Sequence, residues 1–115
     1  MSEGRAAAMR RRRAKIFAAL GDETRLALVA KLCRGSDLSI SELTETAADA
    51  RISRQAVTKH LRVLENAGLV RCSRTGRERR FSYRPEAAEE MREYLEFVTA
   101  KWDEALERLK TFVES

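Results

Sequence analysis

The sequence predicts a mainly α-helical fold with one small β-hairpin, built from about five helices and a two-stranded ribbon. Runs rich in Ala, Leu, Glu and Arg, with a single Pro and few aromatic residues, favour helix over sheet. Residues 52–83 combine an amphipathic helical pattern with a following stretch of alternating apolar and polar residues. A chain of 115 residues has the size of one domain with a single core.

A helix is expected over residues 53–67. Ser53 can cap its start, because the hydroxyl can accept a backbone N–H that the first turn leaves free. Val57, Leu61 and Leu64 recur at helical spacing and form an apolar stripe. Gly68 supplies the left-handed residue that ends the helix.

The other face of this helix is polar and basic. Arg and Gln can make bidentate contacts with base edges, Thr offers a hydroxyl or a methyl group, and Lys is a point charge. A solvated helix face is the alternative explanation for a lone basic helix. The candidate DNA contacts on it are Ser53, Arg54, Gln55, Thr58, Lys59 and Arg62.

A hairpin, the wing, is expected over residues 69–84, because apolar and polar residues alternate on both sides of a turn at 75–78. Arginines gather at its tip, and the candidate DNA contacts there are Arg74, Arg77 and Arg79, with Arg80 beside them. A helix joined directly to such a hairpin is the winged helix-turn-helix arrangement, in which the helix enters the major groove and the wing follows the neighbouring backbone or minor groove.

Charge is distributed unevenly along the chain. Residues 51–84 carry ten Lys and Arg against two Asp and Glu, whereas residues 85–115 carry four against nine. A block of positive charge is the electrostatic footprint of a nucleic-acid-binding protein, with counterion release supplying much of the affinity.

The N-terminal region is expected to start as a flexible arm over residues 1–9, with the domain spanning residues 10–115. A basic run at residues 10–13, followed by Lys15, precedes the apolar Ile16, Phe17 and Leu20 in a helix expected to end at Gly21. The run has two interpretations, contact with DNA phosphates or a solvated helix face, and both stay open.

A second helix is expected from Asp22, its cap, to about Cys33, with Gly35 beyond its end. Its predicted apolar stripe consists of Leu26, Val29 and Ala30.

A third helix is expected to open on a capping box, formed by Ser39 and Glu42, and to hold Leu43 and Ala47. With the connection at residues 49–52 and the helix over 53–67, it makes a helix-turn-helix pair, whose second member enters the groove.

The last helix is expected over residues 86–113, with Pro85 in its first turn. Apolar residues recur along it at alternating separations of four and three, which is a heptad seam and predicts a homodimer. The alternative is that Trp102 and its neighbours fill the chain's own core. The predicted dimer interface comprises Ile16, Phe17, Leu20, Met91, Leu95, Val98, Trp102 and Leu109.

Three segments resemble the ArsR-type winged helix-turn-helix transcriptional regulators: residues 17–26, residues 53–70, and the wing at Gly76 and Arg77. The similarity covers roughly residues 14–112. It implies a cytoplasmic homodimer that binds a palindromic operator in double-stranded DNA through the first residues of its recognition helix, usually as a repressor, with the first and last helices in the dimer interface.

The sequence departs from the family pattern in three places. Glu23 stands where a Pro often starts the second helix, and the connection between Leu43 and Ser53 is longer than usual. The Cys-x-Cys pair of the metal-sensing members is absent, because residues 38–40 are Leu-Ser-Ile, and the ligand pattern on the last helix is missing too.

Neither a metal site nor an active site is predicted. Zinc needs about four converging ligands, and here only Cys33, Cys72 and His60 come into question, with nothing in their spacing to join them. We expect His60 to make a local hydrogen bond or a phosphate contact, and both cysteines to be reduced, buried side chains. No constellation of catalytic residues is present, so we expect a protein that is not an enzyme and holds no cofactor.

Two alternative functions stay open. Arg71 and Arg74 lie near Cys72, which keeps a thiol- or metal-responsive sensor using Cys33 or Cys72 in view. A winged-helix module that binds protein or RNA is the other. No apolar segment is long enough to cross a membrane, so the cytoplasm is the expected location, and the sequence identifies no inducer.

Overall fold

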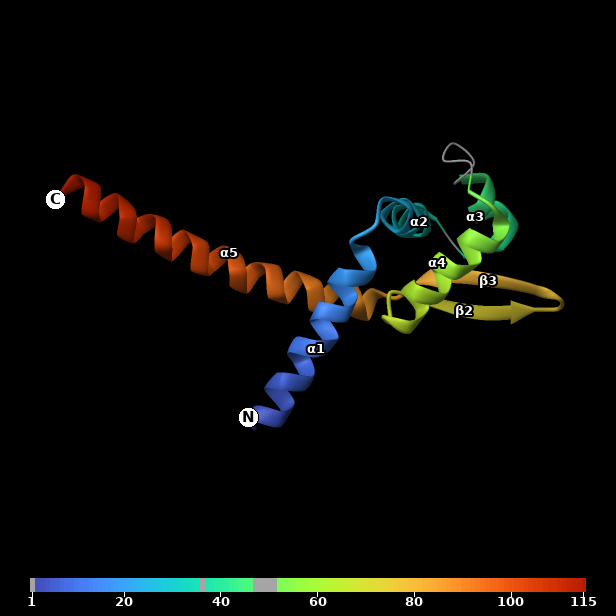
Figure 1. Ribbon diagram of the computed structural model, residues 1–115, viewed down its shortest axis with the longest axis horizontal. Coiled ribbons are helices and arrows are strands. Elements are labelled where there is room, and N and C mark those ends of the chain that lie inside the picture. The colour runs from blue at the N-terminus through green and yellow to red at the C-terminus, as the bar shows by residue number, and fades with distance from the viewer. Residues whose placement is uncertain (1, 36, 47–51) are drawn as a thin grey trace.

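The computed structural model describes residues 2–35, 37–46 and 52–115, which form five helices and one three-stranded antiparallel sheet (Figure 1). The predicted Ala47 and the connection at residues 49–51 lie outside the described residues. The helices are α1 (Glu3–Leu20), α2 (Glu23–Arg34), α3 (Ile40–Thr46), α4 (Arg54–Asn66) and α5 (Pro85–Glu114). The strands are β1 (Leu38–Ser39), β2 (Val70–Thr75) and β3 (Glu78–Tyr83), in the sheet order β1-β3-β2.

Helix α1 begins earlier than predicted. Residues 3–9, expected as a flexible arm, are the first turns of this helix. The Ser2 hydroxyl accepts the N–H of Arg5, and the three alanines that follow have the highest helix propensity of any residue. Capping by Ser2 and the helix propensity of the alanines therefore make this segment helical, although it lies at the chain terminus. The helix ends at Gly21, as predicted.

Helix α2 is capped by Asp22 as predicted, but only part of its predicted apolar stripe meets the core, where Val29 is partly buried and packs against it. The Asp22 carboxylate accepts the N–H of Arg25 at 3.0 Å. Leu28 and Leu32 are fully buried, whereas Leu26 of the predicted stripe is 52% exposed. Apolar residues occupy several faces of this helix, so spacing alone does not select the row that meets the core.

Helix α3 opens on the predicted capping box. The Ser39 hydroxyl accepts the N–H of Glu42 at 3.1 Å, and the Glu42 carboxylate accepts the N–H of Ser39 at 3.0 Å. Strand β1 was not predicted, so the sheet has three strands rather than two. Leu38 pairs with Phe81 and Ser39 with Arg80, in a strand too short to show an alternating pattern.

Helix α4 has the predicted caps and the predicted buried stripe. The Ser53 hydroxyl accepts the N–H of Ala56, and Val57, Leu61 and Leu64 are completely buried. Gly68 has a φ of 80°, and the next residue donates its N–H to the Leu64 carbonyl at 3.0 Å. This Schellman-type end turns the chain directly into β2.

The hairpin turns at residues 75–78, as predicted, through a two-residue loop. Thr75 pairs with Glu78, which leaves Gly76 and Arg77 in the loop, and Gly76 has a φ of 64°. Such a turn favours Gly, because a left-handed backbone is strained in residues with a side chain.

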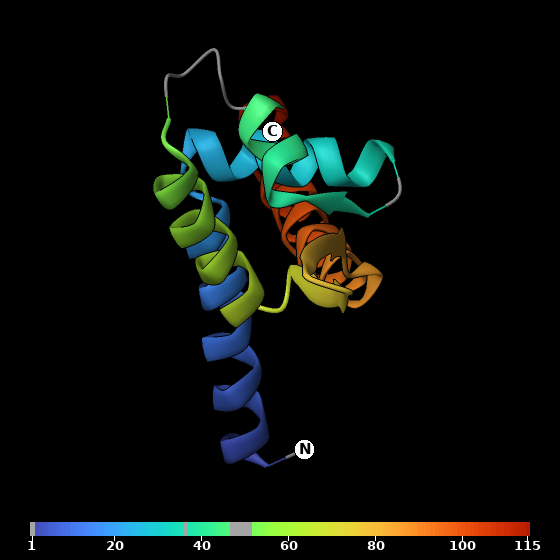
Figure 2. The same cartoon turned by 90° about the vertical axis from the view of Figure 1, so that its right-hand side faces the viewer.

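The core lies where α1, α2, α3, α4 and the sheet meet, and Figure 2 shows α1 and α4 on one side of the molecule. It comprises Ile16, Ala19, Leu28, Leu32, Leu43, Val57, Leu61, Leu64, Leu69, Val70, Phe81 and Ala87. Ile16, predicted at the dimer interface, is only 1% exposed, so this side chain is unavailable to a second copy.

Most of helix α5 extends away from the domain (Figure 1). Within α5, Ala87 is the buried residue and Met91 packs against the core. Beyond these, Leu95 is 51% and Trp102 66% exposed. The alternative that Trp102 fills the chain's own core is therefore wrong.

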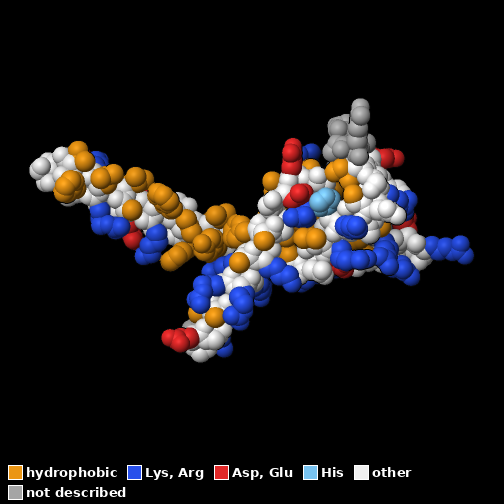
Figure 3. All heavy atoms as spheres, in the orientation of Figure 1, with side chains coloured by type: hydrophobic (Ala, Val, Ile, Leu, Met, Phe, Trp, Pro, Cys, Tyr) orange, Lys and Arg blue, Asp and Glu red, His pale blue; other side chains and the backbone are white. Residues whose placement is uncertain are grey.

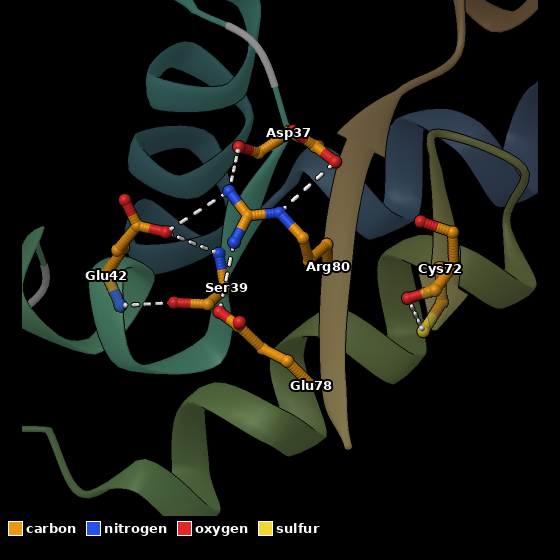
Figure 4. Close-up of polar contacts among 7 residues, drawn as sticks. Asp37, Ser39, Glu42, Cys72, Glu78 and Arg80 are labelled. Atoms are coloured by element: carbon orange, nitrogen blue, oxygen red, sulfur yellow. Dashed lines mark hydrogen bonds and ion pairs between the residues drawn. The ribbon is translucent and has the colours of Figure 1, made fainter. Parts of the chain in front are cut away.

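Arg80 holds the wing against the start of α3. Its guanidinium donates to the Asp37 carbonyl at 2.9 Å and pairs with the carboxylates of Asp37, Glu42 and Glu78 (Figure 4). Burial opposes the charged form, but the hydrogen bond and negative charge of Asp37 outweigh it and raise the pKa of Arg80. Arg80 therefore differs from the other arginines of the wing, because its charge is neutralised within the chain.

Leu61→Ala should lower the free energy of unfolding by about 2–5 kcal/mol, because it leaves a cavity in the centre of the core. Val63→Ala, on the exposed side of the same helix, is the control and should cost about 0.5 kcal/mol or less. Chemical denaturation measures both. Equal losses would show that Leu61 is not a core residue.

Arg80→Ala should loosen the wing, because it removes the link from β3 to Asp37 and Glu42. We expect faster amide hydrogen exchange in β1 and β3 and a lower thermal midpoint. Arg79→Ala, one residue earlier and exposed, should change neither. We call the contacts of Arg80 with Asp37 and Glu42 the Arg80 clamp. Similar exchange rates in the two variants would show that these contacts do not hold the wing in place.

Candidate nucleic-acid interface

Arginines from two separate elements line one groove. The groove has a volume of about 650 Å³ and lies between the starts of α3 and α4 and the tip of the wing. It brings Arg54 of α4 together with three arginines of the wing. Its lining comprises Ser39, Ile40, Ser41, Arg54, Arg74, Thr75, Arg77, Glu78 and Arg79.

The predicted contact face of α4 is open to solvent. Arg54, Gln55, Lys59 and Arg62 are all exposed. Among the residues that the structure describes, no carboxylate forms an ion pair with the three basic side chains. This face therefore presents positive charge that no carboxylate of the described residues compensates.

Two of the predicted contacts already use their hydroxyl groups inside the helix. The Ser53 hydroxyl accepts the Ala56 N–H, and the Thr58 hydroxyl donates to the Arg54 carbonyl at 2.9 Å. The Ser53 hydroxyl keeps its proton for a phosphate oxygen, whereas the Thr58 oxygen can only accept a further hydrogen bond.

The wing places like charges opposite each other. Arg74 and Arg79 are cross-strand partners in the β2–β3 register, and both are exposed. Like charges at directly opposed positions destabilise a sheet, and a polyanion laid across them would remove the repulsion. Arg77 occupies the turn itself.

Figure 3 shows Lys and Arg side chains over α4, the wing and α1, and hydrophobic side chains along α5.

Ser39 and Ser41 also line the groove, although the sequence did not indicate them as site residues. The pairing of β1 with β3 brings them there, and that pairing has no sequence pattern of its own.

His60 makes the predicted local hydrogen bond. Its Nδ1 lies 3.2 Å from Nη1 of Arg25 and 3.8 Å from the Asp22 carboxylate. Because a guanidinium can only donate, Nδ1 must be the acceptor in the bond with Arg25. The N–H of Arg25 at the cap, with the charge of the Arg25 guanidinium, lowers the pKa of Asp22. His60 therefore links α4 to the start of α2.

The two cysteines lie in different surroundings. Cys33 is exposed, which contradicts the prediction of a buried side chain, because it lies on the outer side of α2 next to the buried Leu32. Cys72 is half-buried on β2, separated by β3 from the Arg80 cluster (Figure 4). Across residues 2–35, 37–46 and 52–115, no group of three or more His, Cys, Asp and Glu could hold a metal ion.

Within the same described ranges, no helix is long and apolar enough to cross a membrane.

Comparisons with known proteins agree with this geometry. Residues 13–73 match the model of a helix-turn-helix domain family. An uncharacterized HTH-type transcriptional regulator of Bacillus subtilis (strain 168), YuzN, is 48% identical over 67 residues, which are 56% of this chain and 73% of that protein.

Solved structures extend the similarity beyond the matched domain. An ArsR-like transcriptional regulator from Rhodococcus sp. RHA1 is 38% identical, with a TM-score of 0.71 over 88% of this chain and 92% of its own. A homodimeric winged helix-turn-helix DNA-binding domain from Mycobacterium bovis shares the fold, with 24% identity and a TM-score of 0.64 over 94% of this chain and 93% of its own. The helix-turn-helix match and the Rhodococcus regulator together show that this chain belongs to the ArsR family of winged helix-turn-helix transcriptional regulators.

Proposed function

We propose that this regulator is a repressor that acts in the cytoplasm as a homodimer on a palindromic operator. The observation that carries the proposal is the groove in which Arg54 of α4 meets Arg74, Arg77 and Arg79 of the wing. Two elements that face one polyanion can contact the bases and the backbone of the same half-site.

Helix α4 supplies the base contacts in this proposal. Arg54 and Gln55 lie in its first turn, and their side chains can make bidentate hydrogen bonds to guanine and adenine. Thr58 and Lys59 lie one turn further along, where Lys59 is free to reach a base edge or a phosphate. Ser53 and Arg62 bracket the face and contact the backbone.

The wing supplies positioning contacts. Arg74, Arg77 and Arg79 are exposed and lie at or beside its turn. The Arg80 clamp fixes the wing relative to α3, so these arginines keep a constant direction with respect to α4. Contacts of this kind raise the affinity for every duplex and carry no sequence information.

Helix α5 supplies the dimer contact. Leu95, Trp102 and Leu109 lie on its heptad seam and are more than half exposed in the single chain. Exposed apolar surface of this extent marks an interaction site, and a heptad seam fits a second copy of the same helix. Phe17, Leu20, Met91 and Val98 complete the proposed interface, from which Ile16 is excluded by its burial.

The Mycobacterium domain is described as homodimeric, which supports the same assembly here. In a two-fold dimer the two copies of α4 address half-sites about one helical turn of DNA apart. A dimer seated on an operator that overlaps a promoter represses by excluding the polymerase.

The thiol- or metal-responsive sensor and the protein-binding module receive less support. A sensor that uses Cys33 or Cys72 needs further ligands or a partner thiol, and the described residues provide neither cluster nor disulfide. A protein-binding module would present aromatic or aliphatic anchors, whereas the groove is lined mainly by arginines and hydroxyl groups.

Selection of bound duplexes from a random pool tests the operator. We expect a palindrome whose half-site centres lie about 10 base pairs, or a multiple of that distance, apart. Recovery of no preferred sequence would contradict sequence-specific binding, and a single asymmetric site would contradict the dimer.

Gln55→Ala should relax base preference at one position of each half-site by about 1–3 kcal/mol, because it removes a bidentate contact. Arg77→Ala should instead weaken all duplexes alike and flatten the dependence of affinity on salt concentration. Affinities for the selected site and its single-base variants, over a series of salt concentrations, separate the two effects. Identical profiles for the two variants would refute the division between helix and wing.

Leu95→Asp should raise the dissociation constant of the dimer at least about 100-fold, because it buries an unpaired charge in the seam. Phe97→Asp is the matched control, since Phe97 is also exposed on α5 but lies off the heptad positions. Sedimentation velocity measures both. A monomeric Phe97→Asp together with a dimeric Leu95→Asp would place the interface on another face of α5.

A further inference from the structure

The first helix carries a concentration of positive charge that the proposed function does not use. Residues 3–15 contain six Lys and Arg against a single Glu. Arg12 pairs with Glu90 at 2.8 Å, and Arg13 lies 5.5 Å from the centre of the Tyr94 ring. These two contacts attach α1 to α5 and account for two of the six charges.

Two of the remaining charges form a row on one flank of the helix. Arg11 and Lys15 are four residues apart, so they lie one above the other on α1. Both are exposed, and no carboxylate among residues 2–35, 37–46 and 52–115 pairs with either of them. We name this pair the α1 row.

The α1 row lies on the side of α1 that faces the recognition helix. Lys15 lines a hollow of about 390 Å³ together with Val63 and Asn66, from the last turns of α4. Arg12, by contrast, lines a separate hollow with residues of α5. Figures 1 and 2 both place α1 beside α4, with the first turns of α1 continuing beyond the C-terminal end of α4.

We propose that the α1 row is a third DNA-contacting element, which binds backbone phosphates outside the half-site addressed by α4. This inference rests on the proposed DNA binding and deepens it. Arg54 and Arg62 are exposed on α4, and Lys15 shares a hollow with Val63 and Asn66 in the last turns of the same helix. Because Lys and Arg recognise phosphate by charge, the contact is independent of base sequence.

A duplex fits this row better than the acidic flank of a second copy's α5. Glu90 is already paired with Arg12, and Glu89 and Glu96 are paired with Arg92. Those three glutamates of a second copy would have to leave existing ion pairs to reach Arg11 and Lys15. DNA brings unpaired charge and gains entropy from released counterions.

The test compares two duplexes and three proteins. One duplex is the selected palindrome trimmed to its half-sites, and the other carries about ten further base pairs on each side. The proteins are the wild type, the Arg11→Ala and Lys15→Ala double variant, and a control with Arg108→Ala and Lys110→Ala. The control removes the same charge from exposed positions on α5, and Ala preserves the helix in both variants.

Wild type and control should bind the long duplex more tightly than the short one. The α1 variant should lose this difference, with an affinity for the long duplex at least about tenfold lower at about 0.1 M salt. The slope of log affinity against log salt should fall by about 2 per protomer, because each phosphate contact contributes roughly 0.9. A fourth protein, Arg11→Lys with Lys15 intact, should keep the wild-type slope, because the positive charge is retained.

Three results would overturn the inference. The α1 variant could match the wild type on the long duplex, or lose affinity equally for both duplexes. It could also dissociate into monomers in sedimentation velocity, which would assign the row to a second copy. The proposed function fails separately, if the wild type itself shows no preference for a palindromic duplex.

Discussion

The burial of one stripe of α4 is the constraint on which the rest of the structure depends. Val57, Leu61 and Leu64 are completely buried, and this fixes the rotation of the helix about its axis. Gln55, Lys59 and Arg62 must then point to solvent, because they lie on the opposite side of the same helix. The orientation of the polar face is therefore a consequence of core packing, and needs no contact made by the polar side chains themselves.

The arginines of the domain fall into two groups with different roles. Arg80, Arg12 and Arg92 are neutralised by carboxylates, and the first two fasten one element to another. The arginines at 54, 74, 77 and 79 surround the groove without a partner carboxylate among the described residues. Charge in the first group links elements of the fold, whereas charge in the second is mutually repulsive, and a bound polyanion would remove that repulsion. Sequence composition alone does not distinguish the two groups, because every arginine adds one positive charge to the net charge of +5 whichever group it belongs to.

Much of the architecture could be predicted from local chemistry. The caps at Ser53 and Ser39 and the turn at Gly76 are short-range features, and each lies where its residue type predicts. The predictions from sequence were wrong or incomplete where tertiary contacts determine which residues form an element or become buried. Strand β1 exists only through its pairing with β3, and the buried row of α2 is selected by its neighbours rather than by its own pattern. The arginines of the groove were predicted from the sequence. Its two serines were not, because the pairing of β1 with β3 places them there.

The central claim is that α4 contacts bases while the wing contacts only the backbone of the same half-site. Protection of guanine N7 from methylation, which reports base contacts in the major groove, combined with hydroxyl-radical footprinting of the backbone, tests it most directly on the selected duplex with wild type and with the turn variant Arg77→Ala. The account predicts a two-fold symmetric pattern in which Arg77→Ala removes protection at backbone positions beside each half-site and preserves the protection within it. Loss of protection inside the half-sites, with the outer positions unchanged, would contradict the account, because the wing would then occupy the place assigned to α4.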